Sequence, residues 1–243
     1  MITRFFRALT QQNEVPDASR FGGRVYGHKA RVARHGMLIF LGQILSIAVV
    51  PCFDRGQVFA PPGYVFFSLA LAIAIVWILG YQRLAVLLVA TSAVAGGWFL
   101  FGFAITTGVR PPPILLFLVV KVICVAICIR QAFRSNVPAT QRIYCGAASF
   151  IMLGVVFAGI HAFVSFHELG TYGLPREFEG SREIRWVDFI WFSFATLTTA
   201  GYSDLVPVGS VPLTIASLEG LCGILFPATL IARIASLSED RAS

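Results

Sequence analysis

Apolar residues gather in long runs that polar connectors rich in proline and glycine separate. Six of these runs are long enough to cross a membrane, which takes roughly 17–25 helical residues. We expect transmembrane helices over Met37–Phe53, Tyr64–Gly80, Leu84–Ile105, Pro113–Ile129, Ile143–Phe166 and Val211–Ile234. Prolines and glycines in the connectors, such as "GVRPPP" at 108–113, end the helices between them. The pattern predicts an all-α membrane protein with six transmembrane helices.

A seventh apolar run, "WVDFIWFSFATL" at 186–197, is too short to cross. As a helix it reaches about 16 Å, about half of the ~30 Å hydrocarbon thickness. It therefore has to enter the membrane and return, and about five extended residues, Thr199–Ser203, bring the chain back to the outer face at Asp204. Irregular backbone at that depth is tolerated only inside protein or along a water-filled cavity. We expect a re-entrant loop whose backbone carbonyls bind an ion.

The residues that follow the short apolar run form a recognisable motif. "TLTTAGYSDLVPV", 196–208, resembles the selectivity-filter signature of potassium channels, and the order of span, turret, pore helix, filter and span is similar over about Ile143 to Leu237. The segment "IASLEGLCGILFPATLIARIASL" is similar to the inner helix of small bacterial members. The resemblance implies a passive potassium-selective channel with no enzymatic activity and no cofactor besides potassium ions in the filter. A closed ring of carbonyls also needs four such loops, which predicts a homotetramer around a central pore.

The resemblance assigns ion binding to five consecutive filter residues, Thr199, Ala200, Gly201, Tyr202 and Ser203. Carbonyls of residues 199–202, with the Thr199 hydroxyl, would replace the hydration shell of a monovalent cation. Gly201 is expected at positive φ, where glycine is tolerated without steric cost.

A second group of residues is expected to support the filter and form its outer mouth: Thr198, Trp191, Phe192, Asp204 and Glu219. Tyr202 would turn its ring into an aromatic cuff with the pore-helix residues Trp191 and Phe192. The carboxylate of Asp204 would raise the local cation concentration at the mouth.

Two residues depart from the family pattern. Ala200 replaces the usual valine or isoleucine, so less packing holds the filter. Ser203 replaces the second filter glycine, at a position that normally has positive φ, where another residue costs about 1 kcal/mol. The alternative function is therefore a weakly selective monovalent cation channel. Proteins of another class, a potassium-uptake transporter or a non-conducting membrane subunit, are the remaining alternatives; such transporters carry four pore loops in one chain, whereas this sequence has one.

The last span contains three residues with candidate roles. Gly223 and Pro227 form either a gating hinge or a site of close helix packing. Glu219 is costly inside a membrane, so we expect it to brace the filter or to pair with a polar neighbour. In the preceding spans, His161 is interpreted as a satisfied buried histidine, and Lys121 alone does not make a voltage sensor.

The positions of the basic residues predict how the chain is oriented in the membrane. The chain has 57% hydrophobic and 13% charged residues with a net charge of +7, and its basic residues flank the spans. The positive-inside rule then predicts a multi-pass protein of the plasma (inner) membrane with both termini cytoplasmic. Its expected partners are potassium ions and membrane lipid, and not nucleic acid. The expected organisation is a basic cytoplasmic segment (1–36), a four-helix transmembrane domain without sensor charges (37–130), a cytoplasmic linker (131–142), a pore domain (143–237) and a short cytoplasmic tail (238–243).

Overall fold

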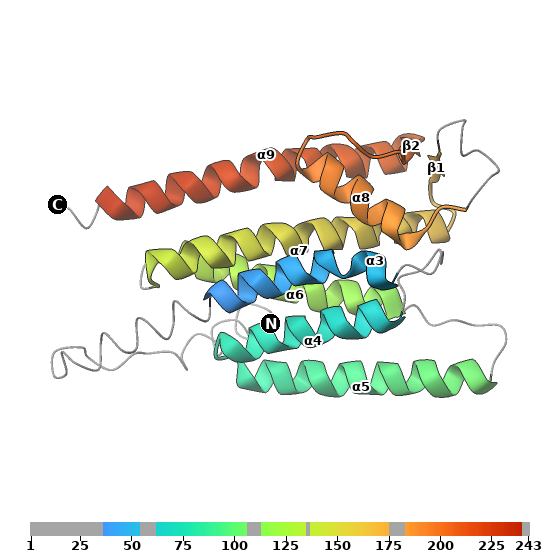
Figure 1. Ribbon diagram of the computed structural model, residues 1–243, viewed down its shortest axis with the longest axis horizontal. Helices are drawn as coiled ribbons and strands as arrows, with labels where there is room; N and C mark the ends of the chain where they lie inside the picture. The colour runs from blue at the N-terminus through green and yellow to red at the C-terminus, as the bar shows by residue number, and fades with distance from the viewer. Residues whose placement is uncertain (1–35, 54–61, 106–112, 135–136, 175–182, 240–243) are drawn as a thin grey trace, which may run out of the picture.

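The computed structural model describes residues 36–53, 62–105, 113–134, 137–174 and 183–239. These residues are mostly helical, and two short strands accompany the helices (Figure 1). A helix over Gly36–Ala48 comes first. The elements that follow are α3 (Val50–Phe53), α4 (Pro62–Ile78), α5 (Gln82–Ile105), α6 (Pro113–Phe133), α7 (Ala139–Phe166), β1 (Thr171–Gly173), α8 (Trp186–Leu197), β2 (Val206–Val208) and α9 (Ser210–Glu239).

Within the described residues, three helices are long and apolar enough to cross a membrane: Leu115–Phe133, Ala139–Phe166 and Ser210–Ser236. They coincide with the last three predicted spans and support a helical membrane protein. The first three predicted spans also fall on helices, whose apolar stretches among the described residues are Gly36–Ala48, Gly63–Ile78 and Gln82–Ala93, the last within the 24-residue α5. The first of them is interrupted just before Pro51, which lacks an amide proton for the helical ladder. Six spans therefore stay a prediction.

Helix α7 occupies the middle of the bundle (Figure 1). It contacts α6 on one side and both α8 and α9 on the other, while α4 joins α5 to α6. Of its spanning window, 61% is buried within the chain, against 6% for α9. Helix α9 is apolar and is not covered within the single chain. Its surface is therefore suited to lipid, to other subunits or to the lining of a pore, and not to bulk water.

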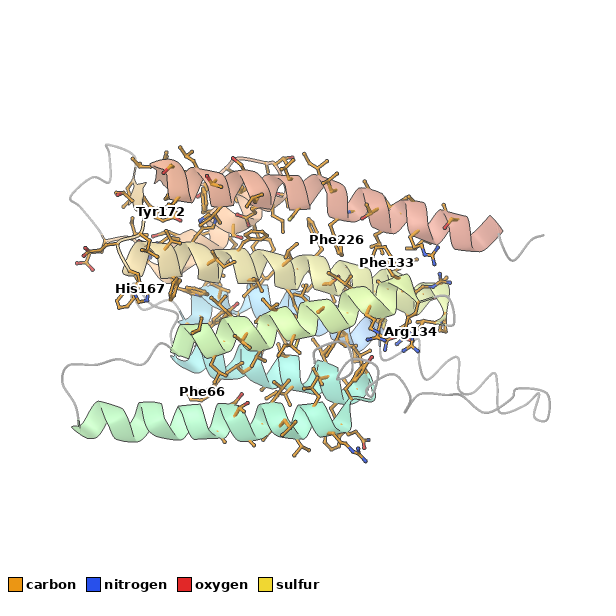
Figure 2. The ribbon with its side chains drawn as sticks, turned by 180° about the vertical axis from the view of Figure 1, so that it is seen from behind. Phe66, Phe133, Arg134, His167, Tyr172 and Phe226 are labelled. Atoms are coloured by element: carbon orange, nitrogen blue, oxygen red, sulfur yellow. The ribbon has the colours of Figure 1, made fainter. Side chains whose placement is uncertain are left out.

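The two ends of the bundle differ in the residues that they present. Tyr172 and His167 lie at one end, whereas Arg134 lies at the other (Figure 2). The prediction that residues 131–142 are cytoplasmic stays a prediction.

The strands β1 and β2 tie the re-entrant segment to the rest of the fold. They pair antiparallel, with Thr171 opposite Val208, Tyr172 opposite Pro207 and Gly173 opposite Val206. The pair joins the chain after α7 to the chain before α9. Helix α8 and residues 198–205 therefore start and end at the same small sheet.

Candidate functional site

Helix α8 has the bounds that the sequence predicts, Trp186–Leu197. At its start, the backbone amide of Arg185 donates to Oδ2 of Asp188 at 2.8 Å, and the Arg185 guanidinium lies 3.5 Å from the other carboxylate oxygen. The carboxylate thereby satisfies an amide at the start of the helix and lies at the positive end of the helix dipole. At the far end, the Thr198 hydroxyl donates to the Phe194 carbonyl at 2.6 Å.

The chain turns back at the end of α8 through two hydrogen bonds. The Thr199 amide donates to the Thr196 carbonyl at 3.0 Å, and the Ala200 amide donates to the Ala195 carbonyl at 2.9 Å. This is the pairing of a Schellman motif, in which the first residue past the helix cap adopts the left-handed conformation. Thr199 accordingly has φ 58°.

This turn corrects two expectations. The returning limb is not extended from Thr199, because the helix cap imposes a left-handed residue there. Ser203 is not at positive φ in the structure, so the backbone strain expected at that residue is absent. Its hydroxyl instead accepts the Leu205 amide at 3.1 Å. Gly201 has φ 67°, which confirms the prediction of positive φ.

The backbone amides and carbonyls of residues 199–202, the limb after α8, differ in their hydrogen-bond partners. The Gly201 amide joins that of Ala200 on the Ala195 carbonyl, at 3.1 Å. No backbone amide of the described residues donates to a carbonyl of Thr199–Tyr202. Residues 198–202 are also exposed in the single chain. The amides of Thr199, Ala200 and Gly201 therefore bond to the end of α8, and the carbonyl oxygens of residues 199–202 are left for another partner.

The aromatic residues of the site separate into two groups. Tyr202 is 62% exposed and Trp191 is 37% exposed, whereas Phe192 is 5% exposed. Phe192 packs edge-on against His161, with ring centroids 4.9 Å apart. Consecutive helical residues point in different directions, so Phe192 faces the interior of the subunit and Trp191 faces outward. The predicted cuff around Tyr202 therefore does not form with Phe192 inside one chain. Asp204, two residues after Tyr202, is exposed.

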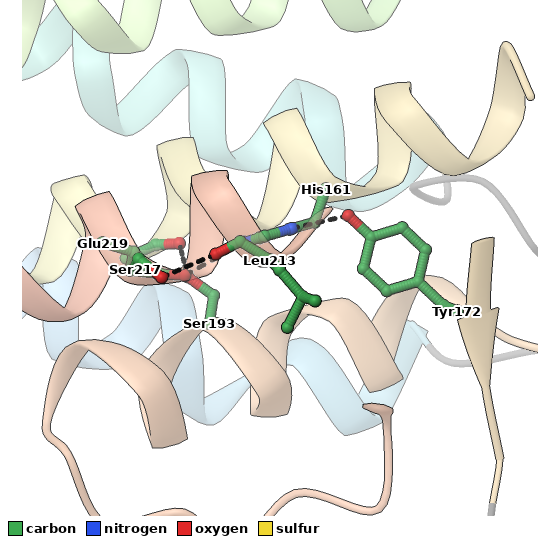
Figure 3. A network of polar contacts seen from close by, with 7 residues as sticks. His161, Tyr172, Ser193, Leu213, Ser217 and Glu219 are labelled. Atoms are coloured by element: carbon green, nitrogen blue, oxygen red, sulfur yellow. Dashed lines mark hydrogen bonds and ion pairs between the residues drawn. The ribbon is translucent and has the colours of Figure 1, made fainter. Parts of the chain in front are cut away.

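Behind α8 lies a polar network, by which we mean Tyr172, His161, Glu219 and Ser193 (Figure 3). His161 Nδ1 lies 2.6 Å from the Tyr172 hydroxyl. Its Nε2 lies 3.1 Å from Oε2 of Glu219. The other Glu219 oxygen contacts the Ser193 hydroxyl, which also lies 2.6 Å from the Gly154 carbonyl. The network thus joins β1, α7, α9 and α8.

The network accounts for two residues that the sequence singles out. Glu219 has polar neighbours, as expected for a carboxyl inside a span, and His161 has a partner on each ring nitrogen. His161, Ser193 and Glu219 are fully buried. Burial raises the pKa of Tyr172 above its ordinary value, so this hydroxyl stays protonated beside His161 Nδ1. Nothing in the sequence singles out Tyr172 or Ser193.

The comparison with known proteins points to the same segment. Residues 150–239 match a family model described as an ion channel. The match begins within α7 and ends with α9, so it includes α8, the limb after it and the polar network. A stretch of 47 residues is 40% identical to the inward rectifier potassium channel Kirbac3.1 of Paramagnetospirillum magnetotacticum. That stretch covers 19% of this chain and 16% of that protein, so the chain spans only a small part of the relative.

Together these matches support an ion-channel segment over residues 150–239. The helices before residue 150 lie outside the matched region. Among them, Lys121 on α6 is fully buried, and its ammonium lies 5.7 Å from the Phe117 ring centroid. Its ammonium has no hydrogen-bond partner among the described residues.

Within the ion-channel region, Gly223 lies where α9 meets the end of α8. A Cβ atom added at this glycine would overlap the backbone carbonyl of Leu197. Glycine is therefore needed here for the close approach of two backbones, which supports the packing interpretation. Four residues later, α9 passes through Pro227 as one continuous helix, Ser210–Glu239. A hinge role for either residue stays a prediction.

Proposed function

We propose that the chain is a passive, potassium-selective channel in which residues 199–202 form the filter. The observation that carries this proposal is the polarised limb after α8, whose amides bond to the helix end while its carbonyls have no amide partner. Rings of backbone carbonyls replace the hydration shell of a potassium ion in filters of this kind. Ser203 would complete the outermost site, and Thr198 and Asp204 would lie at the two ends of the ion path. The ion-channel match over residues 150–239 supports the assignment.

A closed ring of carbonyls requires more than one copy, so we further propose a homotetramer. Exposure of Thr198–Tyr202 and the 6% burial of the α9 spanning window support this assembly. Large apolar side chains project from α9, among them Val211, Leu213, Leu218, Leu221, Ile224, Leu225 and Ile231. In the proposed assembly, neighbouring subunits and lipid cover these side chains, and Tyr202 packs against a neighbouring α8 that includes Trp191. The tetramer would lie in the plasma (inner) membrane with six spans per chain and both termini cytoplasmic.

The bi-ionic reversal potential tests the function. The purified full chain is reconstituted in planar bilayers with potassium on one side and sodium on the other. We expect single-channel currents that reverse far from zero voltage, at a potential that opposes potassium flow into the sodium compartment, because only potassium fits the carbonyl ring. Equal permeability to both cations would support the weakly selective channel instead. Absence of any current from folded protein would support the non-conducting subunit or the transporter.

Replacing Ser203 with glycine separates the two channel hypotheses. Since Ser203 does not have positive φ, glycine relieves no strain, and we expect the S203G reversal potential to match that of the wild-type protein. Ser203→Ala is the control, because it removes the hydroxyl that accepts the Leu205 amide without adding backbone freedom. A marked gain in potassium selectivity in S203G but not in S203A would show that Ser203 limits the filter.

A further inference from the structure

The hydroxyl of Ser193 has one proton but makes two contacts with oxygen atoms in the polar network. The hydroxyl of Ser193 lies 2.6 Å from the Gly154 carbonyl and also contacts Oε1 of Glu219. A carbonyl oxygen has no proton to donate, so if both contacts are hydrogen bonds at the same time, the single hydroxyl proton of Ser193 points toward Gly154. The contact between Ser193 and Glu219 then needs a proton from the carboxyl side.

The hydrogen bonds at the other end of the network can run in the same direction, from Tyr172 through His161 to Glu219. If Tyr172 donates its proton to His161 Nδ1, that nitrogen is the acceptor of a neutral imidazole. The proton of the imidazole is then on Nε2, which donates to Oε2 of Glu219 at 3.1 Å. With a proton on its other oxygen, Glu219 donates to Ser193, and Ser193 donates to the Gly154 carbonyl. Each contact then has one donor and one acceptor.

A charged arrangement satisfies fewer contacts. If His161 were an imidazolium beside a carboxylate, both ring nitrogens would be donors. The Tyr172 hydroxyl would then lose its acceptor, and Ser193 would have one proton for two acceptors. Unpaired polar groups in a site with no exposure cost more than the same groups in water, which favours the neutral arrangement.

We propose that Glu219 carries a proton in the folded protein, so that the polar network is a neutral, one-directional chain of hydrogen bonds that positions α8 for conduction. Glu219 is thus a positioning residue that acts through Ser193. The groups that face it are His161 from α7 and Ser193 from α8, and Tyr172 of β1 lies behind His161. The link to conduction rests on the proposed channel function, whereas the protonation state does not.

The test compares Glu219→Gln with Glu219→Ala. Glutamine copies the protonated acid, because its carbonyl accepts from His161 and its amide donates to Ser193. We expect E219Q to keep potassium flux into liposomes within about threefold of wild type. We expect E219A to reduce flux by about tenfold or more, since it leaves two buried partners unsatisfied. Ser217→Ala is the matched control, because this exposed hydroxyl bonds only to its own helix at Leu213, and its flux should stay at the wild-type level.

An infrared measurement tests the proton itself, without any conduction. The difference spectrum of purified wild-type protein minus E219Q should contain the carbonyl stretch of a protonated carboxylic acid at neutral pH. A carboxylate band in its place, or E219Q behaving like E219A, overturns the proposal. If E219A fails to fold, the spectrum and the comparison of E219Q with wild type still decide. A protonated band in a protein without potassium current would leave this inference standing and reject the channel function.

Discussion

Alanine at position 223 is expected to destabilise the protein and to remove most of its conduction. The added Cβ would overlap the Leu197 carbonyl, which belongs to the backbone at the end of α8 and has no rotamer to relieve the contact. Overpacking of this kind costs about 1–3 kcal/mol in each subunit. Because Leu197 lies directly before the proposed filter, we expect potassium flux in liposomes to fall by about tenfold or more, since 1.4 kcal/mol is a factor of ten.

Gly220→Ala is the control for this variant. It lies on the same helix, and a Cβ atom added there meets nothing within 4 Å in the chain. Thermal unfolding and flux are measured for both variants. The close-packing interpretation predicts a large loss for G223A and little change for G220A. A G223A protein of normal stability with altered open probability would instead identify Gly223 as a hinge.

Alanine at Gly201 should have the largest effect on conduction with little effect on the fold of one chain. Gly201 has φ 67°, a conformation that costs a residue with a Cβ atom about 1 kcal/mol or more. In a ring of four subunits the cost reaches about 4 kcal/mol, which reduces the conducting population by about a thousandfold. Single-channel recording and flux measure this loss.

Gly80→Ala provides the matched control. Gly80 also has positive φ, 90°, and an added Cβ there again meets nothing within 4 Å. It lies between α4 and α5, outside the segment that matches ion channels. We expect G80A to incur the same backbone cost and to keep wild-type conduction. Equal losses in both variants, or normal flux in G201A, would contradict a filter at this position.

The bounds of helix α8 were predictable because their signals are local. The apolar run 186–197 is bounded by polar residues on both sides, and its length alone excludes a crossing. The turn after it was not predictable in detail. Glycine and asparagine are the usual residues in a left-handed helix cap, and the sequence has Thr199 there. The prediction of an extended limb therefore failed at its first residue.

The polar network could be predicted only in part from the sequence. Glu219 and His161 each attract notice in the sequence, because an ionisable side chain inside a span needs a partner. The two residues are 58 positions apart in the chain, and their pairing depends on how α7 packs against α9. No rule of sequence spacing predicts that contact. Tyr172 and Ser193 carry no such signal, because a tyrosine near an interface and a serine in a membrane helix are common without any network.

The short pair of strands also bears on how the re-entrant segment relates to the rest of the chain. Register between Thr171 and Val208 fixes the separation of the two points where this segment leaves and rejoins the bundle. The end of α7 and the start of α9 are therefore held at a constant separation by the same three residue pairs.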